Sequence, residues 1–437
     1  MPMPSHTRTR QLRSRAVPRE YFGTDGVRGI VGEFVTPELF ERLGKASALW
    51  SGRGRVFIGR DTRSSGEQLE EAFARGVASA GGSAVIAGVV PTPAVALLRL
   101  DLGVVISASH NPPEYNGVKF FDRDGRKLSD AAEEESEALL DAPAPGGGEI
   151  DHVDIAADNY LAHVLERFGS DLSGLRIAVD CANGAYSTIA PKAFEQLGAR
   201  VEFIGNKPDG HNINVGCGAT DLAALQRRVV AGKFDLGIAF DGDGDRMLAV
   251  DATGEAVDGD QIVAVLALHL GVDQVAVTTM ANLGFHRLME NRGIRVITTD
   301  VGDRYVLEAL YREGAKLGGE QSGHIIYLRD HVTGDGLASA LLLCGALEGR
   351  TLAEAAAAME RYPQVKRNLP RAGRGPLPDS LRERVAAVNA ELNGDGRVLV
   401  RPSGTEPVVR VLAEAATQGE AEALCARIAS LVTQELG

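Results

Sequence analysis

Short apolar segments alternate along most of the chain with longer segments whose apolar residues recur at helical spacing. A short, almost continuously apolar run predicts a strand buried on both faces, as in a parallel sheet covered by helices. The first predicted strand, 55–61, precedes a predicted helix at 67–80, and another predicted strand, 103–108, ends in a loop. The later predicted strands are 176–181, 201–204, 235–240, 274–279 and 295–299, with helices at 189–197, 222–231, 285–291 and 305–312.

The pattern changes near the C-terminus, where two predicted strands, 397–401 and 408–413, are adjacent in sequence and flanked by helices at 380–391 and 420–436. Two segments rich in Gly and Pro, 142–148 and 369–378, predict loops or domain boundaries. We therefore expect three α/β domains with parallel or mixed sheets and a smaller C-terminal α+β domain. The predicted domains are 20–152, 153–252, 253–366 and 367–437.

The composition narrows the classes of partner. The chain has 437 residues and a formal net charge of −13, from 46 Lys and Arg against 59 Asp and Glu. Nucleic acids and anionic membranes bind basic surfaces, so we expect neither as a partner. No apolar segment approaches the ~20 residues of a membrane span. The four cysteines form no CxxC pair, so reduced thiols and a cytoplasmic location are expected.

Residues 1–19 differ from the rest, with five arginines, three prolines and no acidic residue. A secretory signal needs an apolar centre, which this segment lacks. An Arg-rich organellar transit segment is an alternative, but the composition favours a disordered basic tail.

The segment 240–246, FDGDGDR, places Asp241, Asp243 and Asp245 at alternate positions after a predicted strand. Ligands of open α/β sheets bind at the carboxyl ends of strands, and hard divalent cations prefer carboxylate oxygens. The intervening glycines allow the loop to curl so that the three side chains converge. An EF-hand needs Gly at its sixth and an acid at its twelfth position, which this loop lacks. A metal site is therefore favoured over a solvated acidic turn.

The segment 107–113, SASHNPP, also follows a predicted strand and contains Ser109 and His110. Ser109 is a candidate nucleophile, either activated by a base in a hydrolase or carrying a phosphoryl group beside a metal. The GxSxG elbow of hydrolases is missing. The residues alone leave open a loop hydroxyl beside a histidine that caps a turn.

Two further loops carry polar groups. Segment 401–410, RPSGTEPVVR, is either a phosphate cradle or an ordinary hairpin, and segment 318–324, GGEQSGH, offers polyol-binding groups before the predicted strand 324–328. The candidate residues in them are Arg401, Ser403, Gly404, Thr405 and Arg410, then Glu320, Ser322 and His324.

Arg28, in the glycine-rich segment 21–29 (YFGTDGVRG), and Lys119 are candidate cations, with solvated surface charges as the alternative. Motifs for nucleoside triphosphates, dinucleotides and zinc peptidases are missing from the sequence, which weakens those classes of enzyme.

Taken in order, YFGTDGVRG, SASHNPPEYNGVKFF, FDGDGDR, GGEQSGH and RPSGTEP resemble the functional loops of the α-D-phosphohexomutase superfamily. The resemblance covers essentially everything after the tail and implies four domains around a central cleft. Within the superfamily, segments 208–221 and 278–285 and the residue Gln321 are similar to the bacterial phosphoglucosamine mutase subfamily.

The resemblance also implies roles for the candidate residues. Ser109 would be a phosphoserine required for activity, with one Mg²⁺ bound by its phosphate together with Asp241, Asp243 and Asp245. His110 would support the geometry of the phosphoserine, and Arg28, Lys119 and His324 would handle protons. Sugar hydroxyls would be held by Glu320 and Ser322. The non-reacting phosphate would be held by Arg401, Ser403, Gly404, Thr405 and Arg410.

The reacting centre needs additional cations. Three aspartates, a phosphoserine of about −2 and Mg²⁺ leave roughly −3 before a substrate phosphate arrives. Arg246 is therefore expected to contact substrate, supported by Lys119 and Arg28.

The implied enzyme is an isomerase that interconverts glucosamine 6-phosphate and glucosamine 1-phosphate through a 1,6-bisphosphate. It would supply UDP-N-acetylglucosamine and cell-wall precursor synthesis, and act as a monomer or homodimer. The alternatives are a mutase of glucose or mannose phosphates and a non-catalytic sugar-phosphate-binding protein on the same fold.

Overall fold

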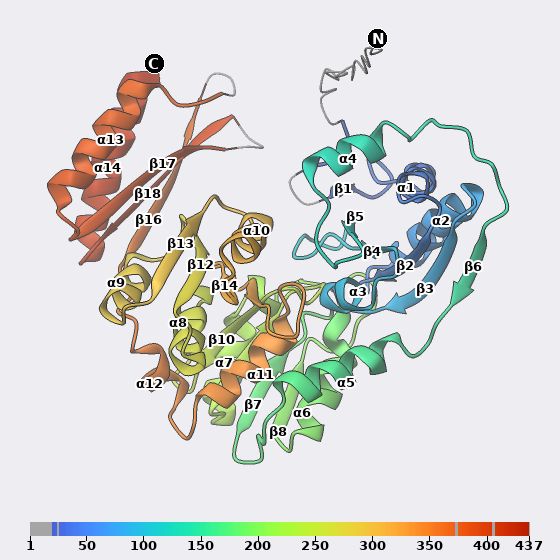
Figure 1. The fold of residues 1–437 in the computed structure, drawn as a ribbon. Helices are drawn as coiled ribbons and strands as arrows, with labels where there is room; N and C mark the ends of the chain where they lie inside the picture. The colour runs from blue at the N-terminus through green and yellow to red at the C-terminus, as the bar shows by residue number, and fades with distance from the viewer. Residues whose placement is uncertain (1–19, 24–25, 372–374, 404–406, 437) are drawn as a thin grey trace, which may run out of the picture.

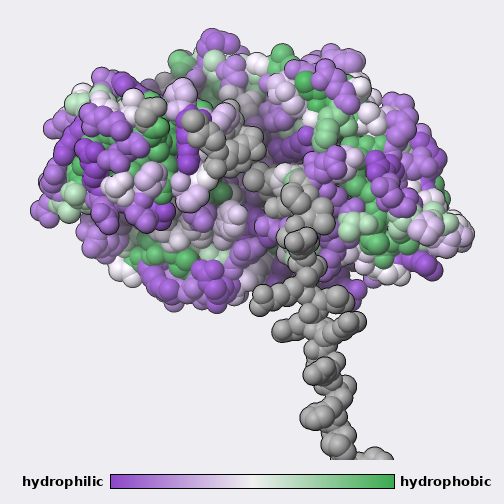
Figure 2. Space-filling view, turned by 90° about the horizontal axis from the view of Figure 1, so that it is seen from above, coloured by the Kyte–Doolittle hydropathy of each residue, from purple (hydrophilic) through white to green (hydrophobic). Residues whose placement is uncertain are grey.

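The computed structural model describes residues 20–23, 26–371, 375–403 and 407–436, so the predicted basic tail lies outside the described residues. Four sheets follow one another along an arc whose ends are the N-terminal and C-terminal domains (Figure 1). Hydrophobic residues occupy several separate areas of the largely hydrophilic face in Figure 2. Within the described part of the chain, none of the helices combines the length and apolar character needed to cross a bilayer.

The first domain holds a six-stranded mixed sheet. Its strands are β1 (Val27–Ile30), β2 (Arg55–Arg60), β3 (Ser83–Val89), β4 (Leu102–Ile106), β5 (Tyr115–Phe121) and β6 (Glu149–His152), and its helices are α1 (Pro37–Trp50), α2 (Gly66–Ser79), α3 (Thr92–Leu98) and α4 (Asp130–Glu137). The order is β1-β5-β4-β2-β3-β6, with β2 parallel to β3 and β4. Strand β5 is antiparallel to both of its neighbours, β1 and β4, so β5 is reversed and the edge strand β1 again runs in the direction of β4.

The second domain holds a five-stranded mixed sheet in the order β11-β10-β9-β7-β8. Its strands are β7 (Arg176–Asp180), β8 (Arg200–Ile204), β9 (Leu236–Phe240), β10 (Met247–Asp251) and β11 (Ala256–Val257). Its helices are α5 (Ala156–Phe168), α6 (Ile189–Gln196) and α7 (Ala223–Gly232), with short 3₁₀ turns η1 (Ala185–Ser187) and η2 (Gly218–Thr220). The predicted boundary after residue 252 therefore separates β11 from the sheet in which it pairs.

The third domain holds four strands in the order β13-β12-β14-β15. They are β12 (Gln274–Thr278), β13 (Arg295–Thr299), β14 (Leu317–Gly319) and β15 (Ile325–Tyr327). The accompanying helices are α8 (Gly259–Leu270), α9 (Leu283–Asn291), α10 (Asp303–Glu313), α11 (Gly336–Ala346) and α12 (Leu352–Ala356).

The C-terminal domain is an antiparallel sheet, ordered β16-β18-β17, covered on one face by two helices. The strands are β16 (Gln364–Pro370), β17 (Gly396–Pro402) and β18 (Val408–Ala415), and the helices are α13 (Asp379–Leu392) and α14 (Gln418–Leu436). The apolar pattern does not predict strand β16, because its Lys, Arg and Asn residues leave no apolar run. This strand begins before the predicted boundary at residue 367. The predicted fold class, three α/β domains and a smaller α+β domain, is confirmed.

Two separate cores matter for function. One apolar cluster runs continuously from Phe57 in the first domain through Phe240 in the second to Val277 in the third. The C-terminal domain has its own cluster around Val411 and Ile428. The first three domains are therefore fused through a shared core, whereas the fourth packs as a separate unit.

Candidate active site

The loop that carries Ser109 follows β4, and the buried side chain of Arg63 holds it in place through hydrogen bonds to its backbone. Arg63 donates from its guanidinium to the carbonyl oxygens of Ser109 (3.0 Å) and Asn111 (2.7 Å). Asp61 accepts from Arg63 Nε at 3.0 Å and from the Ser107 hydroxyl, so the arginine is itself fixed in place. Ser109 adopts a left-handed φ of 51°, which an anchored loop can impose on a non-glycine residue.

The second domain holds the same loop from the other side. Asn214 Nδ2 donates to the carbonyls of Ser109 (2.9 Å) and Asn111 (3.2 Å). A Cβ on Gly242 would lie 2.8 Å from the Ser109 carbonyl oxygen, so only glycine allows this approach. The serine loop and the aspartate loop are thus locked together.

The three aspartates converge as predicted. Asp241, Asp243 and Asp245 follow β9, are buried, and offer ligand oxygens that lie within 4.8 Å of one another. The Ser109 hydroxyl donates to Asp241 Oδ2 at 2.7 Å. The curl that brings the carboxylates together passes through Gly244, whose φ of 79° favours glycine.

A buried polar network packs behind this curl. The Gly336 N–H donates to the Gly244 carbonyl at 3.0 Å, and a Cβ on Gly244 would lie 2.5 Å from the Tyr186 ring. Asp335 caps α11 and accepts from the Tyr160 and Tyr186 hydroxyls at 2.7 and 2.9 Å. The aspartate loop is therefore supported by both the second and the third domains.

The three buried carboxylates repel each other, which shifts their pKa values. Burial, then the charges of Asp243 and Asp245, raise the pKa of Asp241 well above its ordinary value. Burial alone would raise the pKa of Asp245, but Lys119 and His324 lower it well below the usual range. Lys119 Nζ lies 2.7 Å from Asp243 Oδ2 and 3.1 Å from Asp245 Oδ2, and it offsets only part of the negative charge.

The donor set fits a divalent cation. Oδ1 of Asp243 is buried and accepts no hydrogen bond from the described residues. Oδ1 of Asp245 is also buried, and its cationic neighbours, Arg246 Nε at 3.8 Å and His324 Nδ1 at 3.7 Å, lie beyond hydrogen-bond distance. Buried carboxylate oxygens without a hydrogen bond are unfavourable unless a cation binds them. Oxygen-only ligands are those that Mg²⁺ prefers.

Two further residues, Arg246 and His110, lie beside Asp241 and Ser109. Arg246 directly precedes β10, the strand that leaves the metal loop, and its backbone N–H donates to Asp241 Oδ1 at 3.1 Å. His110 Nδ1 lies 3.3 Å from the Ser109 hydroxyl. Burial and the charges of Arg246 and Arg28 lower the pKa of His110 to about 4, so this imidazole is neutral near pH 7.

The sugar loop lies beside the same centre. Glu320 and His324 are buried, whereas Ser322 is exposed in the turn between them. Burial and the neighbouring Asp303 raise the pKa of Glu320. Burial alone would lower the pKa of His324, but Asp303 and Asp245 raise it.

Two of the predicted phosphate-cradle residues, Arg401 and Arg410, lie on the C-terminal sheet. Arg401 on β17 pairs in register with Arg410 on β18, and burial and Arg410 lower the pKa of Arg401. Two arginines directly opposite one another repel, which favours an anion between them. Ser403 follows at the end of β17, where its N–H donates to the Val408 carbonyl at 2.9 Å. Gly404 and Thr405 lie outside the described residues.

The sequence did not single out several residues of the site. Arg63 and Asn214 anchor the serine loop, and Thr92 donates to Asp243 Oδ2 at 2.6 Å. Lys127 of the first domain forms an ion pair with Asp303 of the third. Each lies far in sequence from its partner, so no local spacing pattern could reveal it, although Asp303 follows a glycine at a predicted helix start.

The fold and this centre, with a serine beside three buried aspartates and a separate two-arginine face, define a phosphohexomutase. Models of the phosphoglucomutase/phosphomannomutase family match all four domains: domain I at residues 19–144, domain II at 158–254, domain III at 258–362 and the C-terminal domain at 348–431. The chain belongs to this family, as the resemblance predicted.

Relatives with high sequence identity indicate the subfamily within the phosphohexomutases. A phosphoglucosamine mutase of Moorella thermoacetica is 48% identical across 94% of this chain and 99% of its own. A phosphoglucosamine mutase of Staphylococcus aureus strain Newman is 45% identical across 96% of this chain and 99% of its own. The predicted subfamily, the phosphoglucosamine mutases, and the predicted enzyme class, an isomerase, are confirmed.

Solved structures agree on the fold. A putative phosphomannomutase from Thermus thermophilus superposes with a TM-score of 0.79 at 26% identity, covering 94% of this chain and 98% of the other. An N-acetylphosphoglucosamine mutase from Aspergillus fumigatus, in complex with GlcNAc-6P and magnesium, gives a TM-score of 0.68 at 20% identity, with 96% of both chains covered.

Proposed function

We propose that this chain interconverts glucosamine 6-phosphate and glucosamine 1-phosphate, with Ser109 as the phosphoryl carrier. The observation that carries the proposal is the Ser109 hydroxyl, 2.7 Å from Asp241 within a buried three-aspartate loop. A nucleophile bonded to a carboxylate of a cation-binding cluster suits phosphoryl transfer. The product would enter UDP-N-acetylglucosamine and cell-wall precursor synthesis. The proposal includes a cytoplasmic enzyme that acts as a monomer or homodimer.

Asp241, Asp243 and Asp245 would hold Mg²⁺ together with the phosphate carried by Ser109. The ion would neutralise phosphoryl oxygens and make the phosphorus more electrophilic. The protein's own contribution is a rigid frame, because Arg63 and Asn214 fix the serine loop against the aspartate loop.

The proposed phosphoryl transfer takes place in two steps. In the first, the sugar 1-hydroxyl oxygen bonds to phosphorus, the bond from phosphorus to Ser109 Oγ breaks, and the hydroxyl proton leaves to a base. In the second, the freed Ser109 Oγ bonds to the phosphorus of the 6-phosphoryl group, the bond from that phosphorus to the sugar 6-oxygen breaks, and the 6-oxygen takes up a proton, which restores the phosphoenzyme and leaves glucosamine 1-phosphate. The reverse reaction uses the same two steps in the opposite order.

Charge and protons are handled by the side chains around the serine. Arg246 and Lys119 would neutralise the charge that develops on the phosphoryl oxygens. Arg28, Lys119 and His324 remain the candidates for proton transfer. Neutral His110, beside the serine oxygen, would orient it rather than add charge.

The two ends of the sugar would be held by the other domains. Glu320 and Ser322 would accept and donate hydrogen bonds to sugar hydroxyls. Arg401, Ser403, Gly404, Thr405 and Arg410 would hold whichever phosphate is not reacting, so that either end can face Ser109.

A coupled assay for glucosamine 1-phosphate, run in parallel with glucose and mannose 6-phosphates, tests the proposal. We expect the highest kcat/KM with glucosamine 6-phosphate and a mass increase of one phosphoryl group on Ser109. Equal or better turnover of glucose or mannose phosphate would favour the hexose mutase alternative. A protein that binds all three without turnover would be the non-catalytic alternative.

A further inference from the structure

Strand β16 places two more polar residues on the face that carries the arginines. In the antiparallel register, Asn368 lies opposite Arg410, and Arg410 lies opposite Arg401. Residues paired in this way project from the same face, and the side-chain period of two puts Lys366 on that face as well. The opposite face packs against α13 and α14.

These side chains line a common pocket. Lys366, Asn368, Arg401 and Arg410 border a cavity of about 400 Å³, which Met280 of the third domain also lines. Pockets of this size accommodate small polar ligands. The open face of the sheet therefore presents three cations, not two.

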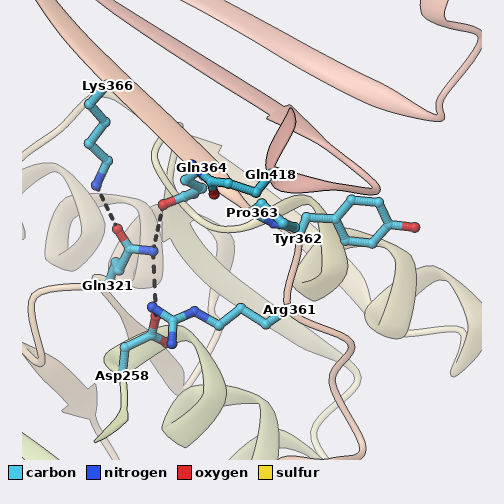
Figure 3. Close-up of a pocket in the computed structure, with 8 residues that line it drawn as sticks. All are labelled: Asp258, Gln321, Arg361, Tyr362, Pro363, Gln364, Lys366 and Gln418. Carbon is cyan, nitrogen blue, oxygen red and sulfur yellow. Dashed lines mark hydrogen bonds and ion pairs between the residues drawn. The ribbon is translucent and has the colours of Figure 1, made fainter. Parts of the chain in front are cut away.

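Lys366 is also connected to the sugar loop (Figure 3). Its Nζ donates to Gln321 Oε1 at 3.0 Å, while Gln321 Nε2 donates to Gln364 Oε1 at 3.0 Å. Gln321 follows Glu320, the proposed sugar contact, directly in the chain. A single amide thus joins the sugar loop to β16.

The hydrogen bond between Lys366 and Gln321 is of a kind that a phosphate oxygen can replace or join. A hydrogen bond between an ammonium and a neutral amide is weaker than one between an ammonium and a phosphate dianion. An ammonium has three donor hydrogens on a flexible four-carbon stem, so Lys366 can add a phosphate oxygen without movement of the backbone. A carboxylate in place of Gln321 would hold the lysine as an ion pair.

We propose that Lys366 is a third cationic residue of the phosphate site on the C-terminal sheet, and that Gln321 is the positioning residue for its ammonium. The proposal rests on the proposed function, because the anion it requires is the non-reacting phosphate of the sugar. It assigns Gln321 a role in coupling the sugar loop to the phosphate site.

Binding is measured by calorimetry in a Ser109→Ala background, where no turnover occurs, with glucosamine 6-phosphate as the probe. Lys366→Met keeps the length of the side chain and removes its charge, and we expect Kd to rise about tenfold. Arg367→Met is the matched control, since it removes one positive charge from the adjacent position on the opposite face. Equal Kd values for the two variants would overturn the role of Lys366.

A double-mutant cycle tests Gln321. Gln321→Leu should weaken binding about threefold alone and have no further effect in a Lys366→Met protein, because it acts through the lysine. Additive effects would overturn the positioning role. In proteins that keep Ser109, Lys366→Met should raise KM about tenfold and leave kcat within about threefold. Failure of unmodified protein to convert glucosamine 6-phosphate would instead contradict the proposed function.

Discussion

The two ends of the site are built differently. At the reacting end, Ser109 and the three aspartates are at most 4% exposed and belong to domains that share one continuous core. At the phosphate-holding end, Arg401 and Arg410 lie on an open sheet face of a domain with its own core. The proposed phosphoryl transfer depends on sub-ångström placement of the reacting groups, and these groups lie in the domains that share one core. The proposed reversible binding of the non-reacting phosphate lies in the C-terminal domain, which has a core of its own.

The joint between these two parts is polar. Glu414 on β18 is fully buried, accepts the Leu283 N–H at 2.9 Å, and pairs with Arg397, which in turn donates to the Ala281 carbonyl. Asn282 exchanges two hydrogen bonds with the Tyr362 backbone at 2.9 and 3.0 Å. Directional contacts define one orientation of the C-terminal domain without fusing it to the third domain's core. Residues 281–283, within the segment 278–285, supply the third domain's side of these contacts.

The largest expected effect is at the reacting end. Ser109→Ala removes the oxygen that we propose accepts and donates the phosphoryl group, so turnover should fall at least about a thousandfold. Intact-mass measurement should show no phosphorylated form, while binding of glucosamine 6-phosphate persists at the C-terminal sheet. A variant with more than a few per cent of the original activity would contradict the assignment of the nucleophile.

Replacing one aspartate should be the next most severe change. Asp243→Asn removes an oxygen ligand of the predicted cation, so Mg²⁺ affinity and kcat should each fall about a hundredfold. Mg²⁺ should raise the melting temperature of the unmodified protein more than that of the variant, because a bound ligand stabilises the folded state. An unchanged Mg²⁺ dependence in both measurements would contradict the metal loop.

The sequence predicts these two ends unequally. FDGDGDR concentrates three carboxylates in one loop after an apolar strand, so local pattern alone predicts a cluster, and the structure brings Asp241, Asp243 and Asp245 together. Lys366 and Asn368 lie on β16, which has no apolar run and belongs to the sheet only through pairing with β18. Arg63 and Asn214 likewise act through tertiary contacts on backbone carbonyls. Spacing therefore finds residues that act within one loop, and misses those that act across domains.

A milder effect is expected at the phosphate-holding end. Arg410→Ala removes one of the paired guanidinium groups, so KM for the sugar phosphate should rise about tenfold while kcat changes less than about threefold. Steady-state kinetics measure both constants, and the phosphorylated fraction of Ser109 should match that of the unmodified protein. An unaltered KM would show that the paired arginines are an ordinary hairpin feature, and an equal loss in kcat would remove the contrast between the two ends.

The smallest expected effect is a pH dependence of stability at the contact between the third domain and the C-terminal domain. Asp260 lies near the start of α8, where its Oδ2 accepts the Asn282 N–H at 2.8 Å and its Oδ1 is buried without a hydrogen bond from the described residues. Burial, then the charges of Asp258 and Glu414, raise its pKa to about 8, although Arg397 opposes the shift. Folded Asp260 therefore keeps its proton up to about pH 8, whereas unfolded Asp260 loses it near its ordinary pKa of 3.8.

Between these two values the folded state binds more protons, so the free energy of unfolding falls as pH rises. Asp260→Asn cannot titrate and keeps an acceptor for Asn282, so its melting temperature relative to the unmodified protein should increase from pH 5 to pH 8, by roughly 2–4 °C, and level off above. Asp273→Asn, an exposed change in the same domain, is the control and should show a constant difference. A constant difference for Asp260→Asn as well would mean that this carboxyl is already ionised in the joint, held there by Arg397.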